Sequence, residues 1–164
     1  MRESIGATWI LSIVITFIVI FVGYLAVSIN YTKAFRIKNT IITKIENSEG
    51  ISDENMSEIE NDIRKQLVYE NYTTVGKCSE VPDGWEKALY VNSSGNDDNA
   101  RALACIYKRE GHSNIENCPK VYYKIKVFFK IDVPVLGDLF TLGVNGDTRG
   151  IYDRANHEDC ITET

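Results

Sequence analysis

The feature that most constrains this chain is an uncharged run of 25 residues, from Ile5 to Ile29. A helix needs about 20 predominantly apolar residues to cross a bilayer. A secretory signal peptide is the competing interpretation, since Ala26-Val27-Ser28 could be a cleavage site, but its apolar stretch is typically only about 7–15 residues. We therefore predict a retained transmembrane helix over residues 5–29, preceded by a short cytoplasmic segment over residues 1–4.

Helical spacing continues past this run. The apolar residues that recur there are Ala34, Ile37, Ile41, Ile42 and Ile45. Charged residues occupy the positions between them, which is typical of an amphipathic helix. We expect this extension over residues 30–49, with Gly50 as a stop because glycine accepts the left-handed conformation that ends helices.

Some residues of the predicted helix are candidates for packing against neighbouring helices. Small and hydroxylated side chains allow close approach in membranes, although transmembrane helices also tolerate such residues without using them. The candidates within the apolar run are Gly6, Thr8, Ser12, Thr16 and Gly23. The apolar stripe of the extension supplies four further helix-packing candidates, Ala34, Ile37, Ile41 and Ile45, and we expect one or both helices to cover the apolar face of the sheet predicted below.

All four cysteines follow the apolar run. They are Cys78, Cys105, Cys118 and Cys160. None stands in a Cys-x-x-Cys pair, and the two histidines do not supply zinc-site spacing, so disulfides are favoured over metal, with buried free thiols as the alternative. Disulfides stabilise small domains in oxidising compartments. Of the three possible pairings, we expect Cys105 with Cys118, closing a short connection, and Cys78 with Cys160, tying the ends of the domain.

Two features disagree about membrane orientation. Four basic residues between Lys33 and Lys44 outnumber Arg2 plus the terminal amine, so the positive-inside rule places the rest of the chain in the cytoplasm. The cysteines favour the opposite side, because cytosolic domains rarely carry disulfides. We follow the cysteines, since the basic residues also fit the polar face of an amphipathic helix. The expected protein is single-pass in the cell membrane, with a cytoplasmic N-terminus and an extracytoplasmic head over residues 50–164.

The head begins with a second, short helix. Ser52 is a candidate cap, and Met56, Ile59, Ile63 and Leu67 form an apolar stripe. After the turn Pro82-Asp83-Gly84 the pattern changes to strands.

Four strands are expected in a mainly antiparallel sheet. The first two cover Glu86 to Asn92 and Ala100 to Arg109, and the strongest alternation runs from Val121 to Ile131. A fourth run begins at Phe140 and reaches Asn145-Gly146, which is either a hairpin turn or a bulge in a strand ending near Tyr152. The predicted class is therefore α+β: a long N-terminal transmembrane and amphipathic helix, a second short helix and a small four-stranded sheet.

Two stretches of the chain resemble TadE-like pseudopilins, the minor components of tight-adherence and related type IV pilus systems in Firmicutes-type bacteria. One runs from Gly6 through the apolar helix to Asn39; the other covers Pro134 to Phe140 and continues into Gly146-Asp147-Thr148. The resemblance implies a helix that packs with other pilin-like or secretion-system subunits in the lipid bilayer and carries a small α+β head outside. Prepilins cut by prepilin peptidase place a Glu inside the apolar run, whereas no acidic residue follows Gly6 within the run here.

Catalysis is not indicated. His112 and His157 are the only histidine bases and are expected at the surface, and the carboxylates Asp132, Asp138 and Asp147 are of the kind that decorate most strand ends. Phosphate-loop, Rossmann and His-Glu-x-x-His motifs are absent, and the polar loop 93–99 lacks calcium-loop spacing. We expect no enzyme, no cofactor, no catalytic, cofactor-binding or metal residues and no small-molecule substrate.

The charge distribution argues against nucleic acid as a partner. Residues 1–46 carry five basic and two acidic side chains, which leaves 13 basic and 21 acidic side chains, a formal charge of −8, for residues 47–164. Phosphate binding needs a clustered basic surface, and the sequence indicates none. Two functions remain: a pseudopilin-like structural subunit, or a stand-alone surface binding module such as an adhesin or sensor head.

Overall fold

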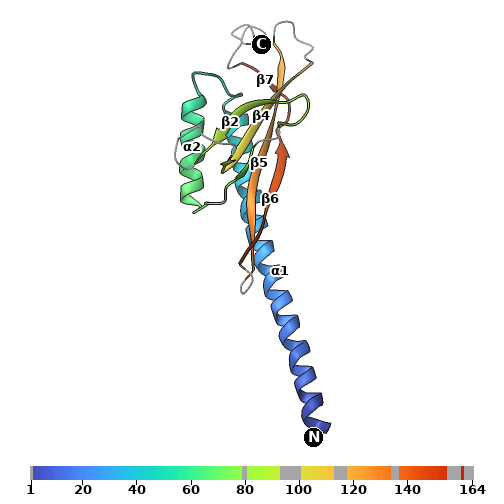
Figure 1. Ribbon diagram of the computed structural model, residues 1–164. Helices are drawn as coiled ribbons and strands as arrows, with labels where there is room; N and C mark the ends of the chain where they lie inside the picture. The colour runs from blue at the N-terminus through green and yellow to red at the C-terminus, as the bar shows by residue number, and fades with distance from the viewer. Residues whose placement is uncertain are drawn as a thin grey trace.

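The computed structural model describes residues 2–78, 81–92, 101–112, 118–133, 137–154 and 160 (Figure 1). Helix α1 (Arg2–Asn47) is a single unbroken helix of 46 residues, about 70 Å long at 1.5 Å per residue. It ends where predicted: Glu49 and Gly50 both have positive φ, and the Gly50 N–H donates to the Ile45 carbonyl at 3.2 Å.

Helix α2 (Met56–Tyr69) buries Ile59, Ile63 and Leu67, as the apolar stripe predicts. The helix begins at Met56, whose N–H donates to the Ser52 carbonyl at 2.9 Å. Just before it, the Ser52 N–H donates to Asn55 Oδ1 at 2.8 Å, and the Asn55 N–H donates to Ser52 Oγ at 3.3 Å. This reciprocal pair is the arrangement of a capping box, so Ser52 makes the capping contact that the sequence predicts, one turn before the first residue of α2.

The strands form two antiparallel sheets. The larger has the order β2 (Glu86–Val91), β4 (Ala104–Gly111), β5 (Lys120–Val133), β6 (Gly137–Asp147), and β7 (Ile151–Tyr152) also pairs with β5. The smaller joins β1 (Gly76–Lys77) to β3 (Arg101–Ala102). The α+β class is confirmed, and the main sheet has five strands where four were expected.

Two sequence alternatives are decided by the strand register. Asn145 pairs with Lys126 and Gly146 with Ile125 inside β6, so Asn145-Gly146 is neither a hairpin turn nor a bulge. The Thr148 N–H then donates to the Tyr123 carbonyl at 2.8 Å, and the chain leaves the ladder before β7. The predicted turn at Pro82-Asp83-Gly84 is confirmed by a hydrogen bond from the Trp85 N–H to the Pro82 carbonyl and a φ of 75° at Gly84.

The sheet has a core on each face. Odd-numbered residues of β5, including Tyr123, Ile125 and Val127, face α1 and α2 in the larger cluster. On the other face the β1–β3 ribbon covers a smaller cluster of Cys78, Ala102, Cys105, Tyr107 and Phe128. A Cβ at Gly76 would come within 2.1 Å of the Phe128 ring, so only glycine permits this close approach.

Candidate functional site

The two halves of α1 have opposite surroundings. In the first half the large apolar side chains are exposed, among them Trp9 (72%) and Phe17 (68%). In the second half Ala34 and Ile45 are fully buried against the sheet. By length and composition α1 contains one candidate membrane span, and its most apolar stretch makes no buried contact with the head. Figure 1 shows this half projecting alone beyond the sheet.

The change from exposed to buried side chains along α1 occurs where the uncharged run ends. The Asn30 amide donates to the Lys130 carbonyl at 3.1 Å, and the Tyr31 ring meets the Phe129 ring edge to face at 5.7 Å between centroids. These contacts hold the lower end of β5 against the helix one residue past Ile29. The head therefore begins at the residue where a spanning segment would leave the bilayer.

The helix-packing candidates separate into two groups. Gly6, Thr8, Ser12 and Thr16 are exposed, and Gly23 is half-buried. The other four candidates, Ala34, Ile37, Ile41 and Ile45, lie in the core of the head itself. Sequence periodicity identified this apolar stripe correctly, and the expected covering of the sheet by the preceding helices is confirmed, because the stripe shares one core cluster with β5 and α2.

Polar contacts fix α2 to α1. Lys44 and Asp62 form an ion pair at 2.6 Å, and this hydrogen bond raises the pKa of Lys44 and lowers the pKa of Asp62. Nearer the membrane end, the Lys33 amine donates to the Asn71 carbonyl at 3.2 Å. The two helices run antiparallel, and between them lies a largely apolar hollow of 490 Å³ lined by residues that include Ile37, Ile41, Ile63 and Leu67.

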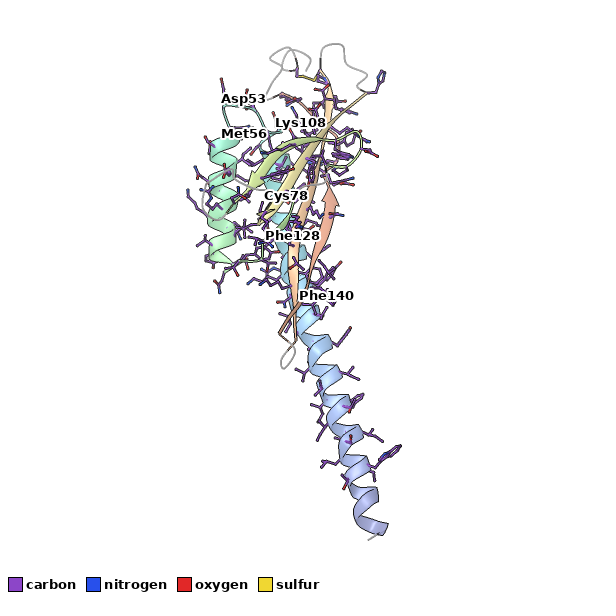
Figure 2. The ribbon with its side chains drawn as sticks, in the orientation of Figure 1. Asp53, Met56, Cys78, Lys108, Phe128 and Phe140 are labelled. Carbon is purple, nitrogen blue, oxygen red and sulfur yellow. A yellow bond between two sulfur atoms is a disulfide. The ribbon has the colours of Figure 1, made fainter. Side chains whose placement is uncertain are left out.

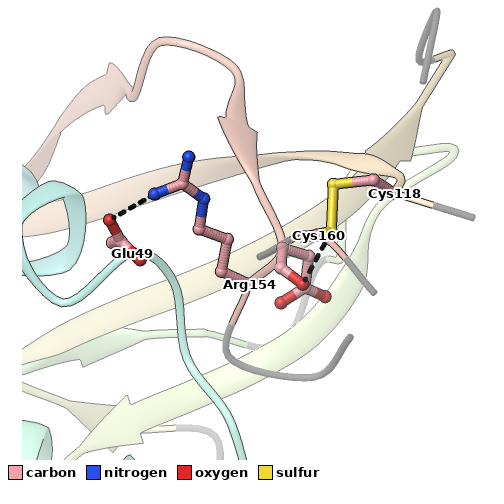
Figure 3. The surroundings of a disulfide bond; sticks show 5 residues. Glu49, Cys118, Arg154 and Cys160 are labelled. Carbon is pink, nitrogen blue, oxygen red and sulfur yellow. Dashed lines mark hydrogen bonds and ion pairs between the residues drawn. A yellow bond between two sulfur atoms is a disulfide. The ribbon is translucent and has the colours of Figure 1, made fainter. Parts of the chain in front are cut away.

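All four cysteines form disulfides, but not in the expected pairs. Cys78 bonds Cys105, and Cys118 bonds Cys160 (Figure 3). Cys105 lies opposite Lys126 in the middle of the β4–β5 ladder. The far end of this ladder is the pair Gly111 and Lys120, and Cys118 lies two residues before Lys120. Six strand residues, about 20 Å, separate those levels, too far for a disulfide. The predicted pairing is wrong because register, not sequence separation, decides which cysteines meet.

The second disulfide lies close to the turn that follows α1. Cys160 lies 3.9 Å from the Asp153 carbonyl, and the neighbouring Arg154 forms an ion pair with Glu49 at 3.2 Å (Figure 3). The chain after β7 is thus attached both to the start of β5 and to the end of α1. This cross-linking joins the far end of the head to its supporting helix.

Of the residues considered for catalysis, Asp132 and Asp138 lie opposite each other in the register of β5 and β6, and the described part of the chain brings no histidine to them. His112 is exposed just after β4, His157 and the loop 93–99 lie outside the described residues, and Asp147 is exposed at the end of β6. Within the described ranges, no three His, Cys, Asp or Glu side chains lie close enough together to hold a metal ion.

The structure contains a surface cluster of cationic and aromatic side chains that the sequence did not predict. Trp85, Arg109, Tyr122 and Lys124 come from three separate segments and meet on the sheet face opposite α1. A charge count along the chain does not reveal such a cluster, because its cations are far apart in sequence. The strand alternation that puts Lys124 and Tyr122 on one face was its only sequence signal.

The chain matches no model of a known protein family, no curated protein and no solved structure.

Proposed function

We propose that this chain is a membrane-anchored, non-enzymatic structural subunit of a pilus or secretion-type surface assembly, similar to pseudopilins. The observation that carries the proposal is the division of α1: one rigid helix presents bare apolar side chains along its first half and forms part of the head's core along its second. In such a subunit, contacts between neighbouring helices in the bilayer fix where each head stands.

The exposed half offers a surface for those contacts. Thr8, Ser12, Thr16 and Gly23 recur at spacings of four and seven residues and therefore share one face of the helix. Thr16 satisfies its own hydroxyl by donating to the Ser12 carbonyl at 2.9 Å, so this hydroxyl is paired within the helix. Small side chains of this kind let two helix backbones approach closely in lipid.

The two disulfides support an extracytoplasmic head. Cys78 and Cys105 are fully buried and join the β1–β3 ribbon to the sheet. Cross-links of this kind persist in oxidising compartments and are rare in the cytosol. With the helix crossing the membrane at residues 5–29, the segment before it then lies in the cytoplasm.

Site-specific photo-crosslinking in membranes tests the assembly. A benzophenone amino acid at Ser12 lies on the small-residue face, and the same probe at Val14 points to the opposite side of the helix. We expect protein adducts from position 12 and mainly lipid adducts from position 14. Recovery of monomer alone from both positions would contradict the assembly and favour a stand-alone surface module.

A second measurement tests the side on which the head lies. After mild reduction of intact cells, a membrane-impermeant maleimide should label the cysteines without lysis. Labelling that appears only after lysis would put the head in the cytoplasm, as the basic residues near Lys33 suggest.

A further inference from the structure

Four side chains form what we term the cation–aromatic face: Trp85, Arg109, Tyr122 and Lys124. The Lys124 amine lies 4.3 Å from the centre of the Trp85 ring, and the Arg109 guanidinium lies 5.0 Å from the same ring. Arg109 also lies 5.8 Å from the Tyr122 ring. The aromatic rings thus hold two cations side by side on the sheet face that α1 does not cover.

These two cations have no acidic partner within the described part of the chain. The strand register puts Asp147 opposite Lys124, but no ion pair forms between them. Tyr122 packs closely against Gly111 and Gly150, where an added Cβ would come within 2.5 Å and 3.0 Å of its ring. The face is therefore a well-supported, positively charged surface on a chain whose net charge is −5.

A complementary acidic surface lies at the start of α2. Glu54 and Glu58 line one side of a surface hollow of 610 Å³ together with Glu49. Arg154 pairs with Glu49, whereas among the described residues neither Glu54 nor Glu58 has an ion-pair partner. We term Glu54 and Glu58 the acidic edge. It lies at the start of α2, with Glu54 in the turn just before the helix and Glu58 in its first turn. Helix α2 flanks the sheet beside β2 (Figure 1), and Met56 in Figure 2 marks its first residue.

Both surfaces stand at the same height along α1. The Ile51 N–H donates to the Tyr123 hydroxyl at 2.9 Å, which puts Lys124 level with the end of α1. On the other side, Asp62 is bound to Lys44, and Glu58 lies one turn farther up the antiparallel helix α2, again level with the end of α1. Both lie about 27 Å beyond Ile29, at 1.5 Å per residue for 18 residues.

We infer that the cation–aromatic face of one copy docks on the acidic edge of a second copy. This inference rests on the proposed membrane anchoring, because parallel anchors in one bilayer bring surfaces of equal height together. Each contact joins unlike surfaces, so it repeats from copy to copy and extends an array or closes a ring. Opposite charges also set which side of a neighbour is approached.

A charge-swap experiment on the full-length chain tests this contact. One variant carries R109E and K124E, and the other carries E54K and E58K. Two differently tagged copies are expressed together in membranes and treated with a zero-length carbodiimide, which joins an amine to a touching carboxylate. For the wild type we expect a cross-link between Lys124 of one copy and Glu54 or Glu58 of the other.

The variants give a specific pattern if the inference holds. Each variant alone should lose about tenfold or more of the dimer cross-link, since like charges then face each other and no amine lies opposite a carboxylate. Expressing the two variants together should restore it, because each reversed surface meets its reversed counterpart. K77E/R101E, an equal change of charge at two exposed residues of the β1–β3 ribbon, should leave the cross-link unchanged. Retained disulfides on a non-reducing gel confirm that each variant is folded.

Three outcomes would overturn the inference: no wild-type cross-link at these residues, an unchanged yield in both single variants, or no recovery in the mixture. If R109E/K124E instead abolishes binding to anionic polysaccharide while self-association is unaffected, the face serves a polyanion and not a second copy. In each case a chain that still forms protein adducts from position 12 leaves the proposed function intact and removes only this contact.

Discussion

The Tyr123 hydroxyl accepts a hydrogen bond from the Ile51 backbone N–H at 2.9 Å, and this contact joins the turn after α1 to the middle of the sheet. Both residues are buried. The same ring lies against Gly50, where an added Cβ would be 3.2 Å from the hydroxyl oxygen. The end of α1 is thus fixed to β5 by this hydrogen bond in addition to the apolar packing of Ile45.

Removing that hydroxyl should destabilise the head. Y123F removes the acceptor of a buried hydrogen bond, and removing one partner of such a bond costs about 1–3 kcal/mol. The free energy of unfolding of the detergent-solubilised chain, from chemical denaturation, measures the loss. Y122F is the matched control, because the Tyr122 hydroxyl makes no hydrogen bond within the described residues, and it should change stability little. Equal stability of the two variants would show that the Tyr123 contact is not stabilising.

The opposite result is expected at Tyr72. Its hydroxyl is buried and has no hydrogen-bond partner among the described residues. Y72F removes this unsatisfied group and keeps the ring, so the variant should be as stable as the wild type or more stable by about 1 kcal/mol. Thermal unfolding followed by circular dichroism gives the comparison. A clear loss of stability would mean that the hydroxyl has a partner in solution.

Alkaline pH should destabilise the head through the same two tyrosines. Burial raises the pKa of Tyr72 and of Tyr123 in the folded chain. Unfolded tyrosine ionises near pH 10, so the stabilising effect of the neutral rings is complete below about pH 10 and is lost as the pH rises towards the folded pKa. Unfolding free energies measured between pH 8 and 11 should fall above pH 10. The fall should be shallower in Y72F; an identical slope would contradict this assignment.

The two halves of α1 should respond differently to truncation. I45A opens a cavity in the core and should cost about 2–5 kcal/mol of head stability, whereas I18A, on the exposed half, should leave the unfolding midpoint of the head unchanged. Denaturation followed by the near-ultraviolet signal of the head measures both. Comparable losses in the two variants would mean that the exposed half packs on the head.

Local features of this fold follow from the sequence, and distant pairings do not. The stop at Gly50, the buried stripe of α2 and the alternation of β5 each depend on residues within a few positions of one another, and each was predicted. The reciprocal hydrogen bonds between Ser52 and Asn55 before α2 are local in the same way.

The errors share a physical origin. Cys78 meets Cys105, 27 residues away, only because the β1–β3 ribbon folds over β4, and the expected pairs with Cys118 and Cys160 ignored that arrangement. The cation–aromatic face likewise depends on the pairing of β4 with β5, because this register puts Arg109 opposite Tyr122. Hydrophobic periodicity predicts that one face of an element is buried, and the tertiary structure shows which other element buries it.

The central claim is that residues 5–29 are held in a bilayer, and alkaline extraction of membranes tests it most directly. The wild-type chain should stay in the membrane pellet, whereas the variant V14R/F17R, with two charges inside the span, should be released because charged side chains are costly at the bilayer centre. Release of the intact wild-type chain into the soluble fraction would contradict the account.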